Sequence, residues 1–158
     1  MLVLIHFKGH TMGGFGGSNK NIGIGCADGR IGKGMIHTVE GSSNMWSIAE
    51  EELMERITES SKATVDHFGK QIAYINCLRN MSVSCDCEGV VALPVVTPDV
   101  DDRKALVERI TTRHGLRQLT YMKEMGMGND RYHLIDIDND DAEITLADAV
   151  KDVVPFEG

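Results

Sequence analysis

Glycine is concentrated near the beginning of this chain, and this concentration limits how the region can fold. Ten of the 17 glycines among 158 residues lie between Gly9 and Gly34. Glycine adds no side chain to a core and loses the most backbone entropy on folding, so such a cluster indicates special dihedral angles or close approach to another group. The same stretch carries side chains that bind metals or anions: His6, Lys8, His10, Lys20, Cys26 and His37. The region therefore predicts a functional site without defining its reaction.

Charge is distributed unevenly along the chain. The formal net charge is −8, yet residues 1–38 carry +3 and the remainder carries −11. An acidic total argues against a general nucleic-acid binder, because such proteins neutralise phosphates with clustered lysines and arginines. A basic, glycine-rich segment on an acidic body suits a small anionic ligand instead. Chance clustering of surface lysines is the alternative.

Length and composition predict one soluble domain spanning residues 1–158. The hydrophobic content is 42% and the charged content 25%, values typical of a globular protein. Four cysteines are too few for a disulfide scaffold. No signal peptide or apolar run long enough to cross a bilayer is present in the sequence. We therefore expect a cytoplasmic protein with reduced thiols and no membrane partner.

The hydrophobic pattern predicts alternating strands and helices. Strands are expected at 1–7, 71–78, 90–96 and 132–138, and helices at 43–67, 101–114, 116–125 and 145–153. Such alternation predicts an α/β fold with a mixed or mostly parallel sheet flanked by helices. The first strand is expected to be buried, and it starts with no preceding element. An unpaired edge there would be an association surface, which predicts a homo-oligomer or a partner subunit.

The Cys85-Asp-Cys87 motif is the sharpest metal signal in the sequence. In an extended segment these two side chains share a face with Cα atoms about 6.6 Å apart. Two thiolates can bind one transition metal or one iron–sulfur cluster, but a closed site normally needs four ligands. The candidates to complete it are His6, His10, Cys26, Cys77 and His37. A pair of structural or redox-labile thiols is the alternative.

The glycine-rich stretch itself predicts an anion-binding loop. Backbone N–H groups of such a loop can form a nest for phosphate or carboxylate. Its expected members are Lys8, Gly13, Gly14, Gly16, Gly17, Lys20 and Asn21. The spacing matches neither a P-loop nor the dinucleotide-binding fingerprint. Tight turns that merely allow close packing are the alternative.

His6 and His10 can act together only if the chain turns between them. In a continuous strand, four residues span about 13 Å, which is too far for one metal ion. Gly9 permits the required turn. With such a turn the two histidines could share a metal or serve as acid and base.

Several of these motifs together resemble the family known as domain of unknown function 362, whose members are often described as uncharacterised Fe–S centre proteins. The resemblance covers most of the chain. It is carried by His6-Phe-Lys-Gly-His10, Gly-Gly-Phe-Gly-Gly17, Lys20-Asn21, His37, Asn76, Ser84-Cys-Asp-Cys87, Pro98-Asp99, His114-Gly115 and Met125-Gly-Met-Gly128. The resemblance implies iron–sulfur binding. It also implies a longer N-terminal part and a ferredoxin insert that this chain lacks, so the chain resembles a shortened member.

Three functions follow from these observations. The first is binding of an iron–sulfur cluster or another transition metal through Cys85 and Cys87, beside an anion-binding loop. The second is a cluster-free enzyme, racemase-like or transferase-like, that uses His6 and His10 as acid and base. The third is a degenerate remnant or subunit that needs a partner.

Overall fold

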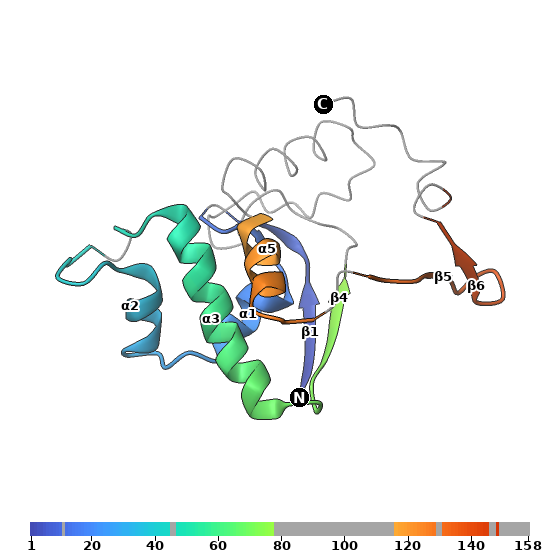
Figure 1. Ribbon diagram of the computed structural model, residues 1–158, viewed down its shortest axis with the longest axis horizontal. Coiled ribbons are helices and arrows are strands. Elements are labelled where there is room, and N and C mark those ends of the chain that lie inside the picture. Colours follow the sequence, from blue (N-terminus) through green and yellow to red (C-terminus); the bar gives the residue numbers. More distant parts are fainter. Residues whose placement is uncertain (11, 45–46, 78–115, 129–130, 146–147, 149–158) are drawn as a thin grey trace, which may run out of the picture.

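The computed structural model describes residues 1–10, 12–44, 47–77, 116–128, 131–145 and 148 (Figure 1). The predicted α/β class is confirmed. The predicted strand at 90–96, the helix at 101–114, all of the helix at 145–153 except residues 145 and 148, and Cys85 and Cys87 lie outside the described residues. The elements, in chain order, are β1 (Leu2–His6), β2 (Lys8–His10), β3 (Gly14–Gly16), α1 (Ser18–Gly25), α2 (Gly32–His37), α3 (Glu50–Phe68), β4 (Ala73–Cys77), α5 (Leu116–Glu124), β5 (Leu134–Asp136) and β6 (Ala142–Ile144).

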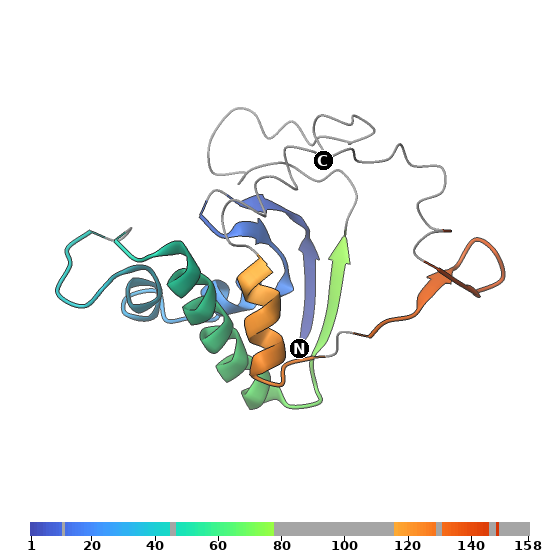
Figure 2. The same ribbon diagram turned by 45° about the horizontal axis from the view of Figure 1, so that its top comes forward.

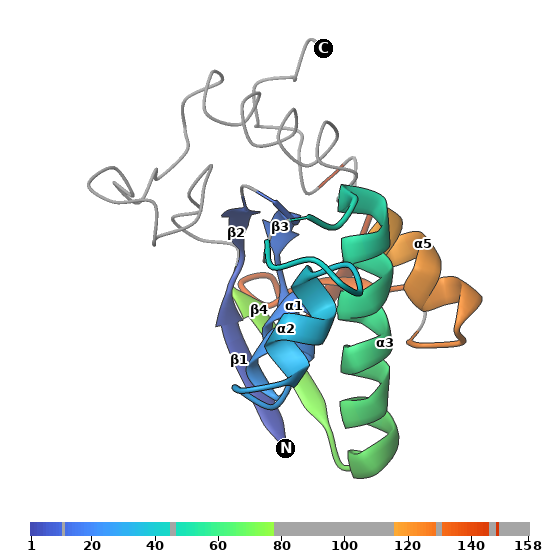
Figure 3. The same cartoon turned by 90° about the vertical axis from the view of Figure 1, so that its left-hand side faces the viewer.

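The strands β1 and β4 form a parallel pair at the centre of the structure. Leu2 is in register with Ala73, and His6 is in register with Cys77. Parallel neighbours cannot be joined by a tight turn and need a long crossover. Here the crossover contains the β2–β3 hairpin and the helices α1, α2 and α3, which places the glycine-rich segment beside the carboxyl ends of the two strands (Figures 1 and 3).

Only one face of the β1–β4 pair is covered by the described helices (Figure 3). Val3 and Ile5 are buried with Ile22 of α1, whereas Leu2 and Leu4 are 64% and 63% exposed. Successive side chains of a strand point to opposite faces, so a strand covered on one side alternates in this way. The prediction of a fully buried first strand is therefore wrong: β1 is half-buried.

Helix α3 carries most of the core. Leu53, Met54 and Ile57 are each at most 1% exposed and pack with Ile36 of α2. Helix α1 crosses α3 at Gly23, where an added Cβ would clash with the Ile57 carbonyl oxygen and lie 3.2 Å from Ile57 Cγ2. The glycine thus allows the two helix backbones to touch.

Helix α3 begins later than the sequence pattern predicts. The expected start at 43 is wrong, because the helix begins at Glu50 after Ala49 in an extended conformation. The three glutamates of the first turn suit the positive end of the helix dipole. The helix ends as predicted at Gly69, whose positive φ of 57° favours glycine.

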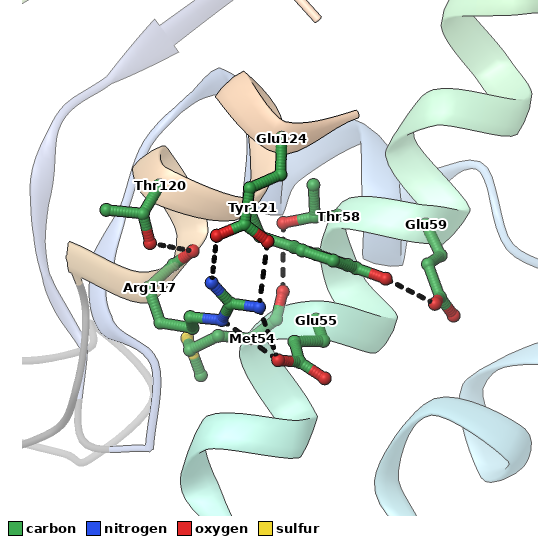
Figure 4. Close-up of polar contacts among 8 residues, drawn as sticks. All are labelled: Met54, Glu55, Thr58, Glu59, Arg117, Thr120, Tyr121 and Glu124. Atoms are coloured by element: carbon green, nitrogen blue, oxygen red, sulfur yellow. Dashed lines mark hydrogen bonds and ion pairs between the residues drawn. The ribbon is translucent and has the colours of Figure 1, made fainter. Parts of the chain in front are cut away.

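Helix α5 is held against α3 by a group of charged and aromatic side chains (Figure 4). Arg117 forms ion pairs with Glu55 of α3 and Glu124 of α5, both at 2.7 Å. Its guanidinium also lies over the Tyr121 ring at 4.7 Å from the centroid, and the Tyr121 hydroxyl donates to Glu59 at 3.0 Å. These contacts fix α5 across the helical layer.

The hairpin of β5 and β6 projects away from the helices (Figures 1 and 2). Residues 137–141 form its turn, and Asp140 and Asp141 have positive φ values of 51° and 56°. The acidic run after β5 is therefore an exposed turn. Among the described helices, none has the length and apolar character needed to span a bilayer.

Candidate anion-binding site

The glycine-rich segment folds as a short hairpin followed directly by helix α1. In this hairpin Lys8 is opposite Gly16, and His10 is opposite Gly14. Gly14 has a φ of 69°, which favours glycine at the tight turn. The predicted loop is thus in part a two-stranded ladder, and part of its backbone hydrogen-bonding capacity is used within the ladder.

A buried amide network holds this hairpin in place. Gln118 of α5 is fully buried, and its Nε2 donates to the Gly13 carbonyl at 2.9 Å and the Phe15 carbonyl at 3.4 Å. Its Oε1 accepts from Asn19 Nδ2 at 3.2 Å. Asn19 Nδ2 also donates to Thr58 Oγ1 at 3.1 Å. One side chain therefore connects the hairpin with α1 and α3.

Two lysines lie across glycines of the hairpin segment. A Cβ on Gly13 would lie 3.5 Å from Lys20 Cδ and 3.4 Å from His10 Nδ1. A Cβ on Gly16 would lie 3.6 Å from Lys8 Cγ. The absence of side chains at these two positions lets the aliphatic parts of the lysines approach the backbone, and at Gly13 the Lys20 side chain lies beside His10.

The hydrogen bonds of His10 define its tautomer. Its Nδ1 lies 3.0 Å from the backbone N–H of Gly13 and 3.2 Å from that of Met12, and both groups donate. A ring nitrogen that accepts cannot carry a proton, so the proton of neutral His10 is on Nε2. The Nε2 of His10 is therefore a hydrogen-bond donor. Binding a metal through Nε2 would require the other tautomer and the loss of both bonds.

His37 has the opposite polarity. It is buried at the end of α2, and its Nδ1 lies 2.8 Å from the Lys33 carbonyl, to which it donates. The pKa of His37 is lowered from 6.5, mainly by burial; the hydrogen bond to the Lys33 carbonyl raises it in part, and the charges of Lys33 and Lys20 lower it further. The ring is thus neutral near pH 7, with Nε2 as its acceptor.

The structure brings some of the predicted site residues together and separates others. Lys20 is the common neighbour: its side chain lies beside His10 and Gly13, and its charge acts on His37. Cys26 is exposed and free at the far end of α1. His6 lies in register with Cys77, a free cysteine on β4. Across the described ranges, no three His, Cys, Asp or Glu side chains are close enough to hold a metal ion.

Sequence reasoning gave no structural role to three residues that shape this site, Thr58, Asn76 and Gln118, of which only Asn76 is among the residues that carry the family resemblance. Asn76 Oδ1 accepts from the Ser18 backbone N–H at 3.1 Å and from Ser18 Oγ at 2.9 Å, so it caps α1 from the neighbouring strand. The available signal was a single asparagine within an apolar strand, a residue type that is costly there unless its amide is hydrogen-bonded. Gln118 gave no comparable signal.

These features define an α/β protein in which a glycine hairpin followed by α1 places Lys20 beside His10, and in which the charge of Lys20 acts on His37. The family model described as domain of unknown function (DUF362) matches residues 1–101, and the chain belongs to this family. The match includes every predicted site residue. No curated protein and no solved structure shows significant similarity to the chain.

Proposed function

We propose that this chain binds a small oxyanion at a basic site formed by Lys8, His10, Lys20, Lys33 and His37. The observation that carries the proposal is the position of Lys20, which lies beside His10 over Gly13 and lowers the pKa of His37 through its charge. Positive groups that disfavour protonation of a neighbouring histidine are stabilised by an anion between them.

The polarity of the two histidines narrows the ligand class. Lys8 and Lys20 are cationic donors, His10 carries its proton on Nε2, and His37 carries its proton on Nδ1, so that its Nε2 is an acceptor. An oxyanion that also carries one proton matches this set, which favours a hydrogen phosphate or a hydroxy carboxylate. If the chain is an enzyme, the same polarity favours His37 as the base with His10 as the donor, in place of the pair His6 and His10.

The test is titration of the full chain with inorganic phosphate and with glycolate, followed by calorimetry and by histidine NMR. A charge-assisted hydrogen bond contributes about 1.5–3 kcal/mol, so Lys20→Gln should weaken binding of the better ligand at least about tenfold. Lys70→Gln is the matched control, because Lys70 is an exposed lysine beyond the end of α3. Equal binding by the wild type and Lys20→Gln would overturn the proposal.

A second proposal is a metal or iron–sulfur centre built on Cys85 and Cys87. It is favoured by the register of His6 with Cys77, which places an imidazole and a thiol on the same sheet face in strands about 4.8 Å apart. Cys85 follows Cys77 by only eight residues. Three thiolates and one imidazole are a ligand set typical of zinc, and thiolates with imidazole also hold iron–sulfur clusters. Cys26 and His37, at the other end of the crossover, are weaker candidates on this geometry.

Metal analysis of protein purified without oxygen tests this second proposal. Iron with acid-labile sulfide and a band near ~400 nm would support a cluster, whereas zinc or nickel without sulfide would support a mononuclear site. The double variant Cys85→Ser, Cys87→Ser should lose the metal, and Cys26→Ser should keep it. Retained metal in the double variant contradicts the assignment.

A further inference from the structure

A cavity of about 580 Å³ lies on the covered face of the β1–β4 pair, beneath helices α3 and α5. It extends from the first turn of α1 to the residues that follow α5, and Figure 2 shows α5 beside these strands. This volume is within the range of small-molecule binding sites. The side chains of this cavity differ in chemistry from those of the basic site described above.

The walls of the cavity are mainly aromatic and flexible apolar side chains. Phe7 and Phe15 stack with ring centroids 5.3 Å apart and an interplanar angle of 22°. Leu119 and Met122 of α5, and Met127 after it, form the opposite side. Stacked rings favour a planar ligand, and methionine side chains adapt to irregular shapes.

Strand β4 supplies hydrogen-bond donors to this apolar space. Asn76 Oδ1 already accepts two hydrogen bonds from Ser18. The part of the Asn76 amide that can bond to other partners is therefore Nδ2, which is a donor. Burial raises the pKa of Tyr74, so its phenol stays protonated at neutral pH. Both residues line the cavity, and together they suit a carbonyl oxygen.

The wall also contains two buried polar atoms that lack hydrogen-bond partners in the described structure, Asn19 Oδ1 and Ser61 Oγ. Asn19 Oδ1 is a fixed acceptor, because Asn19 Nδ2 already donates to Thr58 and Gln118. An unpaired buried acceptor is costly, so this side of the wall is strained in its hydrogen bonding.

No charged side chain is among the described residues that line the cavity. Burying a ligand charge without a partner is strongly unfavourable, so the ligand should be neutral. We propose that this cavity binds a neutral planar aromatic molecule bearing an amide or lactam group. The ring stacks beside Phe7 and Phe15, and the carbonyl accepts from Asn76 and Tyr74. This is a second site, beyond the proposed oxyanion function.

Ligand-observed NMR on the full chain tests this proposal with three probes: benzamide, benzoate and cyclohexanecarboxamide. A fragment of this size is expected to bind with a Kd of about 1 mM. Benzoate differs from benzamide mainly in charge, and cyclohexanecarboxamide in planarity, so each should bind at least about tenfold more weakly. Comparable binding of benzamide and benzoate, or no benzamide binding at about 20 mM, would overturn the proposal.

Two variants locate the binding. Leu119→Trp fills the cavity from a residue that is 52% exposed and should abolish benzamide binding. Leu116→Trp is the matched control, because Leu116 lies on the same helix, is 54% exposed and does not line the cavity.

Asn76→Asp keeps the acceptor that caps α1 and removes the amide donor. It should therefore weaken benzamide binding at least about tenfold and leave the helical circular dichroism unchanged. Unchanged benzamide binding in Leu119→Trp or in Asn76→Asp overturns the assignment. Phosphate affinity should be unaffected by Leu119→Trp, which separates this result from failure of the oxyanion proposal.

Discussion

Gly23 of α1 lies against the backbone of Ile57 in α3, so closely that a methyl group at position 23 would overlap the Ile57 carbonyl oxygen. This contact sets the distance between two helices that share a core. It also fixes the site, because the first turn of α1 carries Asn19 and Lys20 while α3 carries Thr58. One of the clustered glycines therefore serves packing, and its effect reaches the ligand-binding side chains through a rigid helix.

Gly23→Ala should destabilise the protein. Overpacking against a backbone carbonyl costs about 1–3 kcal/mol, which exceeds the gain of about 1 kcal/mol that alanine normally brings to a helix interior. Gly25→Ala is the control, because nothing lies within 4 Å of a Cβ at position 25. Urea denaturation should show a loss of unfolding free energy for Gly23→Ala and none for Gly25→Ala. Equal stability of the two variants would contradict the close contact.

Gln118→Leu should lower the free energy of unfolding by more than a typical substitution on a helix would. The change keeps the volume but removes the Gln118 bonds of the Gly13 and Phe15 carbonyls and one of the two bonds of the Asn19 amide, which keeps its bond to Thr58. Unpaired buried polar groups cost about 1–3 kcal/mol each, so we expect a total loss of about 2–4 kcal/mol by denaturant unfolding. Thr120→Ala on the same helix removes an exposed hydroxyl and should change stability by less than about 0.5 kcal/mol. A mild effect of Gln118→Leu would show that the network is not essential.

The main elements of the fold follow from local sequence patterns. The strand pattern at 71–78 and the helix at 116–125 correspond to β4 and α5, because both have clear periodicity and end at recognisable signals. The sequence pattern predicts a start at 43 because serine and asparagine, the residue types at 43 and 44, favour helix N-caps, whereas the helix begins at Glu50. Local propensity does not determine the path that the chain takes before the helix.

The candidate site was predictable only in its residue types. Glycines, lysines and histidines in one stretch indicated an anion site, and the structure brings Lys20, His10 and Gly13 together. The burial of Gln118 was not predictable, because Leu116 and Leu119 define the apolar stripe of α5 and are nevertheless more than half exposed. Partners that are about a hundred residues apart, such as Asn19 and Gln118, have no signature in one sequence.

We predict that the chain self-associates through the open face of the β1–β4 pair, and the exposed residues on that face allow a test. Leu2, Leu4 and Ile75 are 64%, 63% and 48% exposed on that face. If a second copy covers it, Leu4→Lys should shift the protein toward the monomer in size-exclusion chromatography with light scattering. Ile31→Lys, at an apolar residue 66% exposed on another surface, should leave the mass unchanged. A monomeric wild type at high concentration would contradict the prediction.

The ion pairs of Arg117 should stabilise the docking of α5 in a salt-dependent way. Glu124 and then Glu55 raise the pKa of Arg117 through hydrogen bonds, so the guanidinium is always charged. Arg117→Leu should lower Tm at low ionic strength, and about 1 M salt should reduce the difference from the wild type because screening weakens exposed pairs. Lys62→Leu removes a pair within α3 and should have a smaller effect. A salt-independent loss in Arg117→Leu would instead indicate lost packing on Tyr121.

The titration of His37 gives the most direct view of the basic site. Its pKa in the folded protein is lowered from 6.5, so in the window below 6.5 the unfolded chain binds a proton that the folded state does not. Stability should therefore fall as the pH drops from about 7 to about 5, and this part of the loss should disappear in His37→Gln.

Lys20→Met removes one of the charges that disfavour the imidazolium and should raise the pKa of His37 toward its ordinary value, as measured by NMR of the ring protons. Lys70→Met should leave it unchanged. Bound phosphate should also raise this pKa, because an anion near Lys20 favours the protonated ring. A His37 pKa that responds to neither Lys20→Met nor phosphate would show that the two side chains do not belong to one site.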